Sequence, residues 1–275
     1  MAKRKKSSKK KKSLVRRIWR FLWIFVLACF ALSLLLVGLY KFVNPPLTPL
    51  MVHRFNQQLF QKDRKVNFER HYVKYEDISQ NLIDAVVASE DGNFVHHHGF
   101  DVTMLKQSYR ENKLGHRVRG GSTISMQTAK NAFLPHHRSM LRKGFEAYFT
   151  QLIEWTWGKR RIMECYLNII EFGDGIYGCE AASQHYFGHS AKTLTKREAA
   201  ALAVTLPSPL KRNPAHATPY FRSQTGVIVA RMSKYGHIRV ENYKEVQERD
   251  KKRGRQQETL WDFVKWYFEQ EKKDK

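Results

Sequence analysis

The sequence predicts a mostly α-helical domain that follows a single membrane-spanning helix. Three observations support this fold class. Phe21–Tyr40 is a run of twenty residues without a charge, which is long enough to span a bilayer as a helix. Beyond it, apolar residues recur at helical spacing in several segments that begin at capping residues or end at glycine or proline. The alternating pattern of half-buried strands is not found over any length that predicts a sheet.

Charge and composition limit the classes of partner. The chain has 275 residues and a net charge of +24, from 49 Lys and Arg against 25 Asp and Glu. Eleven basic residues and no acidic ones lie in Met1–Arg20. The remainder therefore has 38 Lys and Arg against 25 Asp and Glu, a net charge of +13. This favours a phosphate-bearing substrate or a lipid surface. Cys29, Cys165 and Cys179 match no metal-site spacing, and a Cys165–Cys179 disulfide is only weakly indicated.

The flanks of the apolar run predict an uncleaved membrane anchor. Trp19 and Trp23 at one end and Tyr40 at the other are typical of membrane interfaces. A cleaved signal peptide is the alternative, but its apolar core would be shorter and followed by a small-residue cleavage site. The positive-inside rule keeps the basic block Lys3–Arg20 in the cytoplasm. Residues from about 41 onward then lie outside the cytoplasm, which argues against a nucleic-acid partner.

The domain is predicted to be a succession of helices. We divide the chain into a basic tail (1–20), a transmembrane helix (21–40), a linker and membrane-proximal segment (41–76), a globular domain (77–240) and a charged C-terminal helix (241–275). Gly158 is expected to end a long helix that runs through Trp157. The other helical segments are Asp77–Ala88, Phe100–Lys113, Lys159–Phe172, Ala181–Phe187, Thr195–Leu206 and Tyr220–Tyr235.

The first candidate site follows a buried apolar run, Ile83–Ala88, which leads directly into Glu90 and Asp91. A carboxylate at the edge of an apolar wall tends to have a raised pKa, which suits proton transfer near neutral pH. Most Glu-Asp pairs are solvated, so this stretch alone does not identify a catalytic group. The histidines of His96–His98 cannot all face one ion on a regular element, and no metal site is predicted there.

Two further stretches are rich in cations. In Arg119–Asn131, two glycines form a turn, a hydroxyl residue can cap the helix that follows, and Gln127, Lys130 and Asn131 share one helix face. This suits phosphate binding, although a plain capped helix is the alternative and the spacing of a Walker loop is missing. Next, Arg138, Arg142 and Glu146 are successive i,i+4 neighbours, which indicates either a surface ion pair or a carboxylate held ionised beside spare cations.

Taken together, these stretches resemble the peptidoglycan glycosyltransferases, the family of the monofunctional biosynthetic transglycosylases and of the N-terminal domain of class A penicillin-binding proteins. Four family motifs occur in order between residues 80 and 235. Met126 replaces a glutamine of the second motif, and Gln224 stands where the fifth motif has an arginine, two residues after Arg222. The matching residues are Glu90, Asp91, Phe94, His97 and Gly99, then Gly120–Ile124, Gln127, Lys130 and Asn131, then Arg142, Lys143 and Glu146, then Lys159, Ile162, Glu164, Tyr166, Leu167 and Asn168.

The resemblance implies a fold and a reaction. The fold is lysozyme-like and α-helical, with a lobe that contacts the membrane, and apolar parts near residues 133–157 are expected to dip into the bilayer. The reaction polymerises lipid II into β-1,4-linked glycan, inverts the MurNAc anomeric carbon and releases undecaprenyl pyrophosphate. The resemblance places the protein in the inner membrane as a single-pass protein, with its catalytic domain in the periplasm and other cell-wall or division proteins as potential partners.

The resemblance also assigns roles. Glu90 takes the place of the base, and Glu146 that of a second essential carboxylate. The resemblance leaves open whether a divalent cation such as Mg²⁺ takes part. Such an ion would bridge the pyrophosphate oxygens without a dedicated protein site. Pyrophosphate binding is implied for Ser122, Gln127, Lys130, Arg138 and Arg142, and supporting roles for Asp91, Phe94, His97, Asn131, Lys143 and Asn168.

Two alternatives stay open at this level. A membrane-anchored, lysozyme-like lytic enzyme would also carry a catalytic Glu, but a neutral glycan leaving group does not require the cations near Glu146. A non-enzymatic cell-wall scaffold would need charge, but not two acids in motif context. Consumption of lipid II, as opposed to cleavage of finished glycan, distinguishes the three.

Overall fold

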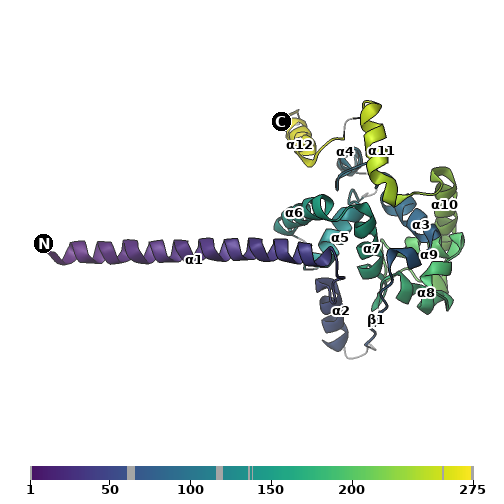
Figure 1. The fold of residues 1–275 in the computed structure, drawn as a ribbon, viewed down its shortest axis with the longest axis horizontal. Coiled ribbons are helices and arrows are strands. Elements are labelled where there is room, and N and C mark those ends of the chain that lie inside the picture. Colours follow the sequence, from purple (N-terminus) through teal and green to yellow (C-terminus); the bar gives the residue numbers. More distant parts are fainter. Residues whose placement is uncertain are drawn as a thin grey trace. The chain divides into compact units, whose positions relative to one another are not determined.

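The structure is a computed structural model that describes residues 2–60, 66–115, 120–135, 137, 139–255 and 257–273. The chain forms two units, Met1–Val43 and Asn44–Lys275, and the first consists largely of helix α1 (Ala2–Tyr40) (Figure 1). Within α1, Arg16–Tyr40 is long and apolar enough to cross a membrane, and its side chains are mostly exposed. The predicted span Phe21–Tyr40 lies entirely inside this helix.

Helices also dominate the second unit, as the sequence predicts. Each segment predicted as helical between residues 77 and 240 overlaps an observed helix. The helices are α2 (Pro49–Phe60), α3 (Gln80–Glu90), α4 (Val102–Lys113), α5 (Ile124–Phe133), α6 (Met140–Thr156), α7 (Lys159–Ile169), α8 (Cys179–Phe187), α9 (Lys196–Thr205), α10 (Pro219–Tyr235), α11 (Tyr243–Lys252) and α12 (Leu260–Lys273).

Local sequence explains where the helices near the site begin and end. Ser79 and Thr123 cap α3 and α5, each by accepting a hydrogen bond from a free backbone N–H of the first turn. Ser139 does the same for α6. Gly158 separates α6 from α7 at a φ of +78°, a backbone conformation that costs glycine little and other residues more. These signals fix the ends of the helices that carry the cationic and acidic residues.

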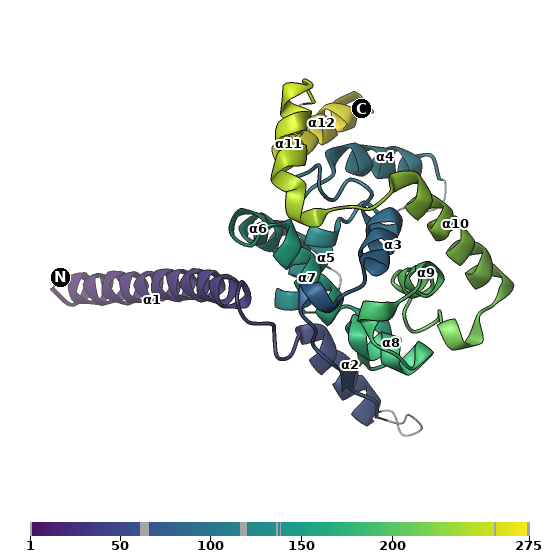
Figure 2. The same ribbon diagram turned by 45° about the vertical axis from the view of Figure 1, so that its right-hand side comes forward.

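Two layers of packing form the core of the second unit. Helix α3 packs against α9 and α10, and α5 packs against α6 and α7 (Figure 2). The apolar faces that meet are fully buried, and the run predicted to be buried ahead of Glu90 is part of them. Its members and their neighbours include Leu82, Ile83, Val86, Ile124, Ile153, Ile162 and Tyr166. This packing holds the end of α3 beside the helices that carry the second, third and fourth motifs.

A small sheet that the sequence does not predict closes one side of the unit. Its order is β1-β3-β2, with β1 (Glu69–Arg70) parallel to β3 (Ile176–Tyr177) and β2 (Glu171–Gly173) antiparallel to β3. Strands of two or three residues are too short to show alternation. Gly175 makes the close approach possible, since a Cβ there would lie 2.0 Å from the carbonyl oxygen of Asn67.

The C-terminal segment and the cysteines differ from expectation. Instead of one charged helix over 241–275, the structure contains α11 and α12, because a turn ending at Gly254, with a φ of +74°, interrupts the helix. Cys165 and Cys179 are buried and free, so the weakly indicated disulfide is not formed.

Candidate active site

Glu90 lies at the C-terminal end of α3 and lines a cleft of about 580 Å³. The opposite parts of this cleft come from the turn before α5 and from the last turns of α10. Burial raises the pKa of Glu90, and the neighbouring Asp91 carboxylate raises it further. The cations of Lys130 and Arg212 and a hydrogen bond from Gln127 act in the opposite direction. The predicted carboxylate with a raised pKa is therefore present, and it faces a space that can hold a substrate.

Gln127 holds the Glu90 carboxylate in place. Its Nε2 donates a hydrogen bond of 2.9 Å to Glu90 Oε2, and its Oε1 accepts one of 3.2 Å from the Tyr166 hydroxyl. The buried Tyr166 comes from α7, so three helices determine the orientation of one carboxylate. The second bond also fixes which end of the Gln127 amide points at Glu90, because a hydroxyl that donates must meet the amide oxygen.

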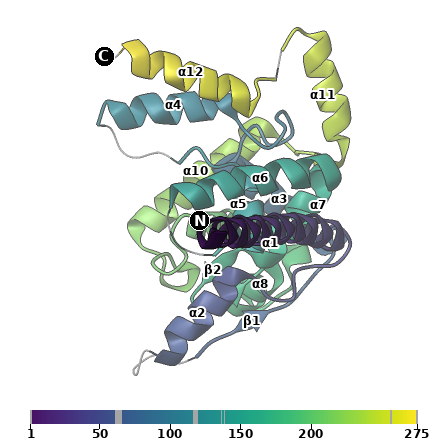
Figure 3. The ribbon, with the colours of Figure 1, turned by 90° about the vertical axis from the view of Figure 1, so that its left-hand side faces the viewer.

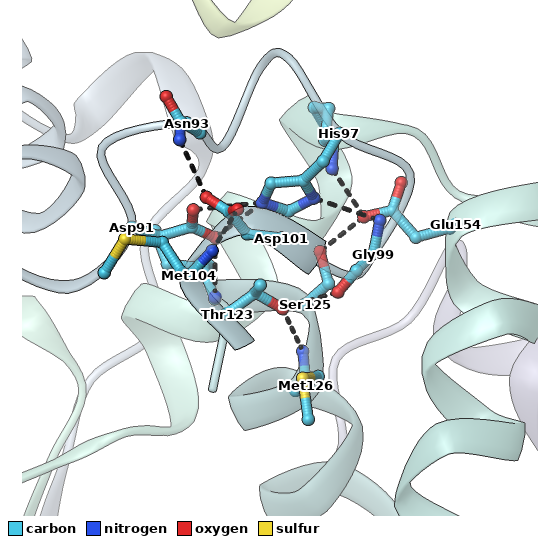
Figure 4. A network of polar contacts seen from close by, with 12 residues as sticks. Asp91, Asn93, His97, Gly99, Asp101, Met104, Thr123, Ser125, Met126 and Glu154 are labelled. Atoms are coloured by element: carbon cyan, nitrogen blue, oxygen red, sulfur yellow. Dashed lines mark hydrogen bonds and ion pairs between the residues drawn. The ribbon is translucent and has the colours of Figure 1, made fainter. Parts of the chain in front are cut away.

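Asp91, in contrast, serves the structure of the loop (Figure 4). Its buried carboxylate accepts hydrogen bonds of 3.0 Å from His97 Nε2 and from the backbone N–H of Ile124 at the start of α5. His97 Nδ1 accepts a hydrogen bond from Gly99 N, so the ring carries its proton on Nε2. Thr123 closes the arrangement by donating to the carbonyl oxygen of Gly99 at 2.6 Å. These contacts join the first motif to the second.

A buried ion pair beneath this loop escaped the sequence analysis. Lys159 is completely buried, and its Nζ donates to Glu154 Oε1 at 2.6 Å and lies 4.6 Å from the centre of the Phe94 ring. Ser125 donates to the same carboxylate oxygen. Burial lowers the pKa of Lys159, and the adjacent carboxylate opposes that shift. The signals in the sequence were that Lys159 matches the fourth motif and that Glu154 lies eight residues after Glu146 on α6.

Glu146 is the centre of the cationic cluster. Its carboxylate is almost fully buried and accepts hydrogen bonds from Arg142 Nη1, at 2.9 Å, and from Lys143 Nζ. Lys143 also reaches the hydroxyl of Ser122, at 3.5 Å. Burial lowers the pKa of Lys130, Arg142 and Lys143 lower it further, and the carboxylates of Glu146 and Glu90 oppose this change. Lys130 is thus within electrostatic reach of both acidic groups.

Several predicted residues have other surroundings. Arg138 lies outside the described residues. Asn131 is buried, and its Nδ2 has no hydrogen-bond partner among the residues that the structure describes. Asn168 bonds through its side chain to both backbone groups of Val73, at 3.0 and 2.9 Å, so it ties α7 to the segment before α3. His96 pairs with Asp250, with His96 Nδ1 lying 2.6 Å from Asp250 Oδ2.

The α10 wall of the cleft was not predicted. Arg231, Lys234 and Tyr235 line the cleft, while Gln224 does not. Arg222 is exposed and donates to the carbonyl oxygen of Ala217. The spacing of Arg231 and Lys234, three residues apart on one helix face, is the signal that could have identified them. Among the described residues, no group of three or more His, Cys, Asp or Glu side chains could hold a metal ion.

Comparisons with known proteins agree with this geometry. A family model described as "Transglycosylase" matches residues 56–233. The biosynthetic peptidoglycan transglycosylase of Aeromonas hydrophila is 42% identical over 226 residues, which cover 82% of this chain and 95% of the relative. Proteins of the same name from Shewanella oneidensis and Caulobacter vibrioides are 41% and 48% identical and cover 85% and 72% of this chain, and 99% and 83% of their own lengths.

The matched region runs from α2 to α10 and contains every predicted site residue. The helical second unit has the lysozyme-like fold of this family. The resemblance carried by the four motifs, the cleft around Glu90 and the similarity over most of the chain all lead to one assignment. The chain belongs to the transglycosylase family and is a peptidoglycan glycosyltransferase of cell-wall synthesis.

Proposed function

We propose that this enzyme polymerises lipid II. Glu90 accepts the proton of the GlcNAc 4-hydroxyl as that oxygen attacks the MurNAc anomeric carbon of the growing chain. The C–O bond to undecaprenyl pyrophosphate breaks on the opposite face, the carbon inverts, and a β-1,4 link forms. The observation that carries this proposal is the Glu90 carboxylate, whose pKa burial raises, which Gln127 fixes in place and which lies in a cleft that Arg231 and Lys234 also line.

The leaving group needs cations more than it needs an acid. Pyrophosphate gains negative charge as the bond breaks, and fixed cations in a partly desolvated site stabilise that charge. Lys130 and Arg142 supply positive charge on the side of Glu146. Burial favours loss of the Lys130 proton, and Glu146 counters this effect, so we assign Glu146 the role of keeping the neighbouring cations charged and oriented.

A second set of cations suits the second substrate. Both donor and acceptor carry a lipid pyrophosphate, and a single cluster cannot hold both groups. Arg231 and Lys234 line the same cleft as Glu90 but belong to α10, apart from the cluster on α5 and α6. We assign them to the pyrophosphate of the acceptor, in place of the arginine that the fifth motif lacks here.

Hydrolysis of finished glycan is less well supported. Most glycoside hydrolases use a second carboxyl group across the scissile bond, as acid, base or nucleophile. Asp91 and Asp101 also line the cleft, but Asp91 is held by His97 and Ile124, and Asp101 caps α4 and accepts from Asn93. Glu146 is engaged by two cations. The carboxylates near Glu90 are therefore already committed to other contacts.

The residues present do not fit a resident divalent cation. Glu146 is paired with cations, Asp91 accepts from His97 and a backbone N–H, Glu90 accepts from Gln127, and the described residues offer no cluster of three ligands. Mg²⁺ would enter with the pyrophosphate oxygens of the substrate, and no step of the mechanism depends on it.

The membrane anchor suits a substrate with a long lipid tail. We propose that the basic block Lys3–Arg20 stays in the cytoplasm and that the second unit works at the periplasmic surface of the inner membrane. Exposed apolar residues of α6 are suited to dip into that surface. They are Met140, Leu141, Phe145 and Trp155.

The decisive experiment follows fluorescent lipid II on a gel, with the detergent-solubilised native chain and with Glu90→Gln. Polymer that forms with the native chain but not with Glu90→Gln would establish both the reaction and its base. Polymer from both would leave the reaction in place but move the base to another residue. A folded native chain that leaves lipid II unchanged, with and without Mg²⁺, but cuts purified glycan would support the lytic enzyme instead.

A further inference from the structure

Helix α12 carries aromatic residues on two faces, and one face is covered by α4. Trp266 and Tyr267 pack edge-on against Tyr109 of α4, with ring centroids 5.4 and 5.3 Å apart. The guanidinium group of Arg110 lies 5.4 Å from the Trp266 ring, and the Tyr109 hydroxyl donates to Glu271 at 3.0 Å. These contacts fix the rotation of α12 about its axis, so its other face is held outward.

The outer face combines exposed aromatic rings with lysines. Trp261, Lys265, Phe268 and Lys272 follow one another at spacings of four, three and four residues and therefore form one stripe. Trp261 is 64% exposed and Phe268 60%. Lys265 Nζ lies 5.8 Å from the Trp261 ring, so its charge stays beside an apolar surface. Glu269 is the one acidic residue among the exposed, described residues of the helix.

The position of α12 adds to this observation. In Figure 1, α12 and α6 lie along the left-hand edge of the second unit, and Figure 3 shows α12, α4 and α6 from that side. Helix α6, which carries exposed apolar residues, and helix α4, which is followed by Leu114 at 71% exposure, thus lie on the same side of the unit as α12. The α12 segment lies beyond residues 56–233, the part matched by the family model.

We propose that the outer face of α12 docks on the anionic surface of a lipid bilayer. Exposed Trp and Phe bury their rings at the boundary between head groups and acyl chains, while lysine stems reach past them to lipid phosphates. Each lysine near an anionic surface strengthens binding about fivefold. The proposal does not depend on the lipid II reaction, because it concerns only where the second unit rests.

A second copy of this chain suits the stripe less well. In a symmetric pair, the same patch meets itself, so Lys265 and Lys272 would face the same lysines of the other copy. Two rings separated by lysines would also bury little apolar surface. The lysines between them would meet no partner of opposite charge. An anionic lipid surface satisfies the rings and the lysines together.

The test places a fluorophore on the stripe of the full-length chain. Phe268→Cys in a Cys29→Ser background leaves Cys165 and Cys179, which are buried, as the other thiols. The environment-sensitive dye is attached at position 268, and the protein is placed in nanodiscs of zwitterionic lipid alone or with about one third anionic lipid. The matched control carries the dye in place of Tyr220, an exposed aromatic residue of α10 on the opposite side of the unit in Figure 1.

We expect blue-shifted emission and quenching by lipid-borne nitroxides at position 268 in the anionic discs, but not at position 220. The double charge reversal Lys265→Glu/Lys272→Glu should lower the ratio of docked to undocked protein by about 30-fold or more, from about fivefold for each lysine. The same charge reversal at two exposed residues of α9, Lys196→Glu/Arg197→Glu, should leave the ratio of docked to undocked protein unchanged.

Three outcomes would overturn the proposal. Emission at position 268 that is the same in detergent and in anionic discs would show that the stripe does not contact lipid. Equal shifts in both lipid mixtures that survive the charge reversal would show that the lysines take no part. A shift that appears only when discs hold two copies would assign the face to self-association. Helical circular dichroism and lipid II turnover in detergent, both unchanged, confirm that each variant is folded.

Discussion

Gln127 Nε2 donates a 2.9 Å hydrogen bond to Glu90 Oε2 and so connects the second motif to the residue of the first motif that we propose as the base. The bond favours the ionised carboxylate, whereas burial in the cleft favours the protonated one. The balance of these two effects sets the pH at which Glu90 becomes able to accept a proton. A glutamine on α5 therefore influences the ionisation of a carboxylate at the end of α3.

Replacing Gln127 should move the acidic limb of the rate profile. Gln127→Met removes the donor at nearly constant volume, so the pKa of Glu90 rises further. Because the base acts in its ionised form, we expect the acidic limb of kcat/KM to shift to higher pH by roughly one unit. Tyr166→Phe keeps the donor and should shift the limb less. An acidic limb that stays in place in Gln127→Met would mean that Glu90 is not the titrating base.

Glu90→Gln should make the protein more stable at neutral pH. The pKa of Glu90 is higher in the folded than in the unfolded state, so its contribution to stability falls as pH rises from the unfolded pKa through the folded pKa. The neutral amide avoids this penalty. We expect a Tm about 2–4 °C higher at pH 7.5, and no gain below about pH 4, where both states are protonated. Glu245→Gln, an exposed change on α11, is the control and should leave Tm unaltered at both pH values.

Glu146→Gln should impair the reaction mainly at high pH. Without its charge, the pKa of Lys130 falls further, and the protonated lysine is lost at lower pH. We expect the alkaline limb of kcat/KM to move to lower pH, with a loss of about 100-fold near pH 8. Breaking a buried pair also costs about 3–5 kcal/mol of stability, so unfolding must be measured in parallel. Lys143→Met removes a cation that lowers the pKa of Lys130, so it should not move the alkaline limb to lower pH. A loss that is uniform across pH would contradict a role through Lys130.

Arg231 and Gln224 should differ sharply. Arg231→Ala removes a cation that lines the cleft, and we expect kcat/KM for lipid II to fall about 30-fold, equivalent to ~2 kcal/mol for a hydrogen bond to a charged group. Gln224→Ala, on the same helix but outside the cleft, should stay within about twofold of the native enzyme. Equal effects of the two substitutions would remove the basis for assigning the acceptor pyrophosphate to α10.

The pair of Lys159 and Glu154 should matter for folding. Lys159→Met leaves Glu154 buried without its partner, and we expect a loss of about 3–5 kcal/mol in the free energy of unfolding. Adding Glu154→Gln to Lys159→Met should restore much of the lost free energy of unfolding, because no uncompensated buried charge remains. Chemical denaturation of the three variants gives the comparison. Simple additivity of the two losses would show that the residues are not coupled.

The predicted helices and the anchor follow from local information. Phe21–Tyr40 needs only its length and lack of charge, and α3 needs only Ser79 to begin and an apolar run to be buried. The strands β1–β3 were missed for the same reason, since two or three residues carry no period. Gly254 was not recognised as a helix end, which is why one C-terminal helix was expected where there are two.

The sequence by itself determined the family, a helix long and apolar enough to cross a membrane, and the positions of Glu90 and Glu146 in their motifs, because motif spacing and hydrophobic periodicity act over a few turns of helix. Only the tertiary structure decided which side chains meet. Gln127 reaches Glu90 across 37 residues of chain, and the Lys159–Glu154 pair is buried beneath Phe94. Arg231 joins the cleft only because α10 packs against α3. Contacts between distant segments depend on how helices pack, and a polar residue alone does not reveal whether it is solvated or paired.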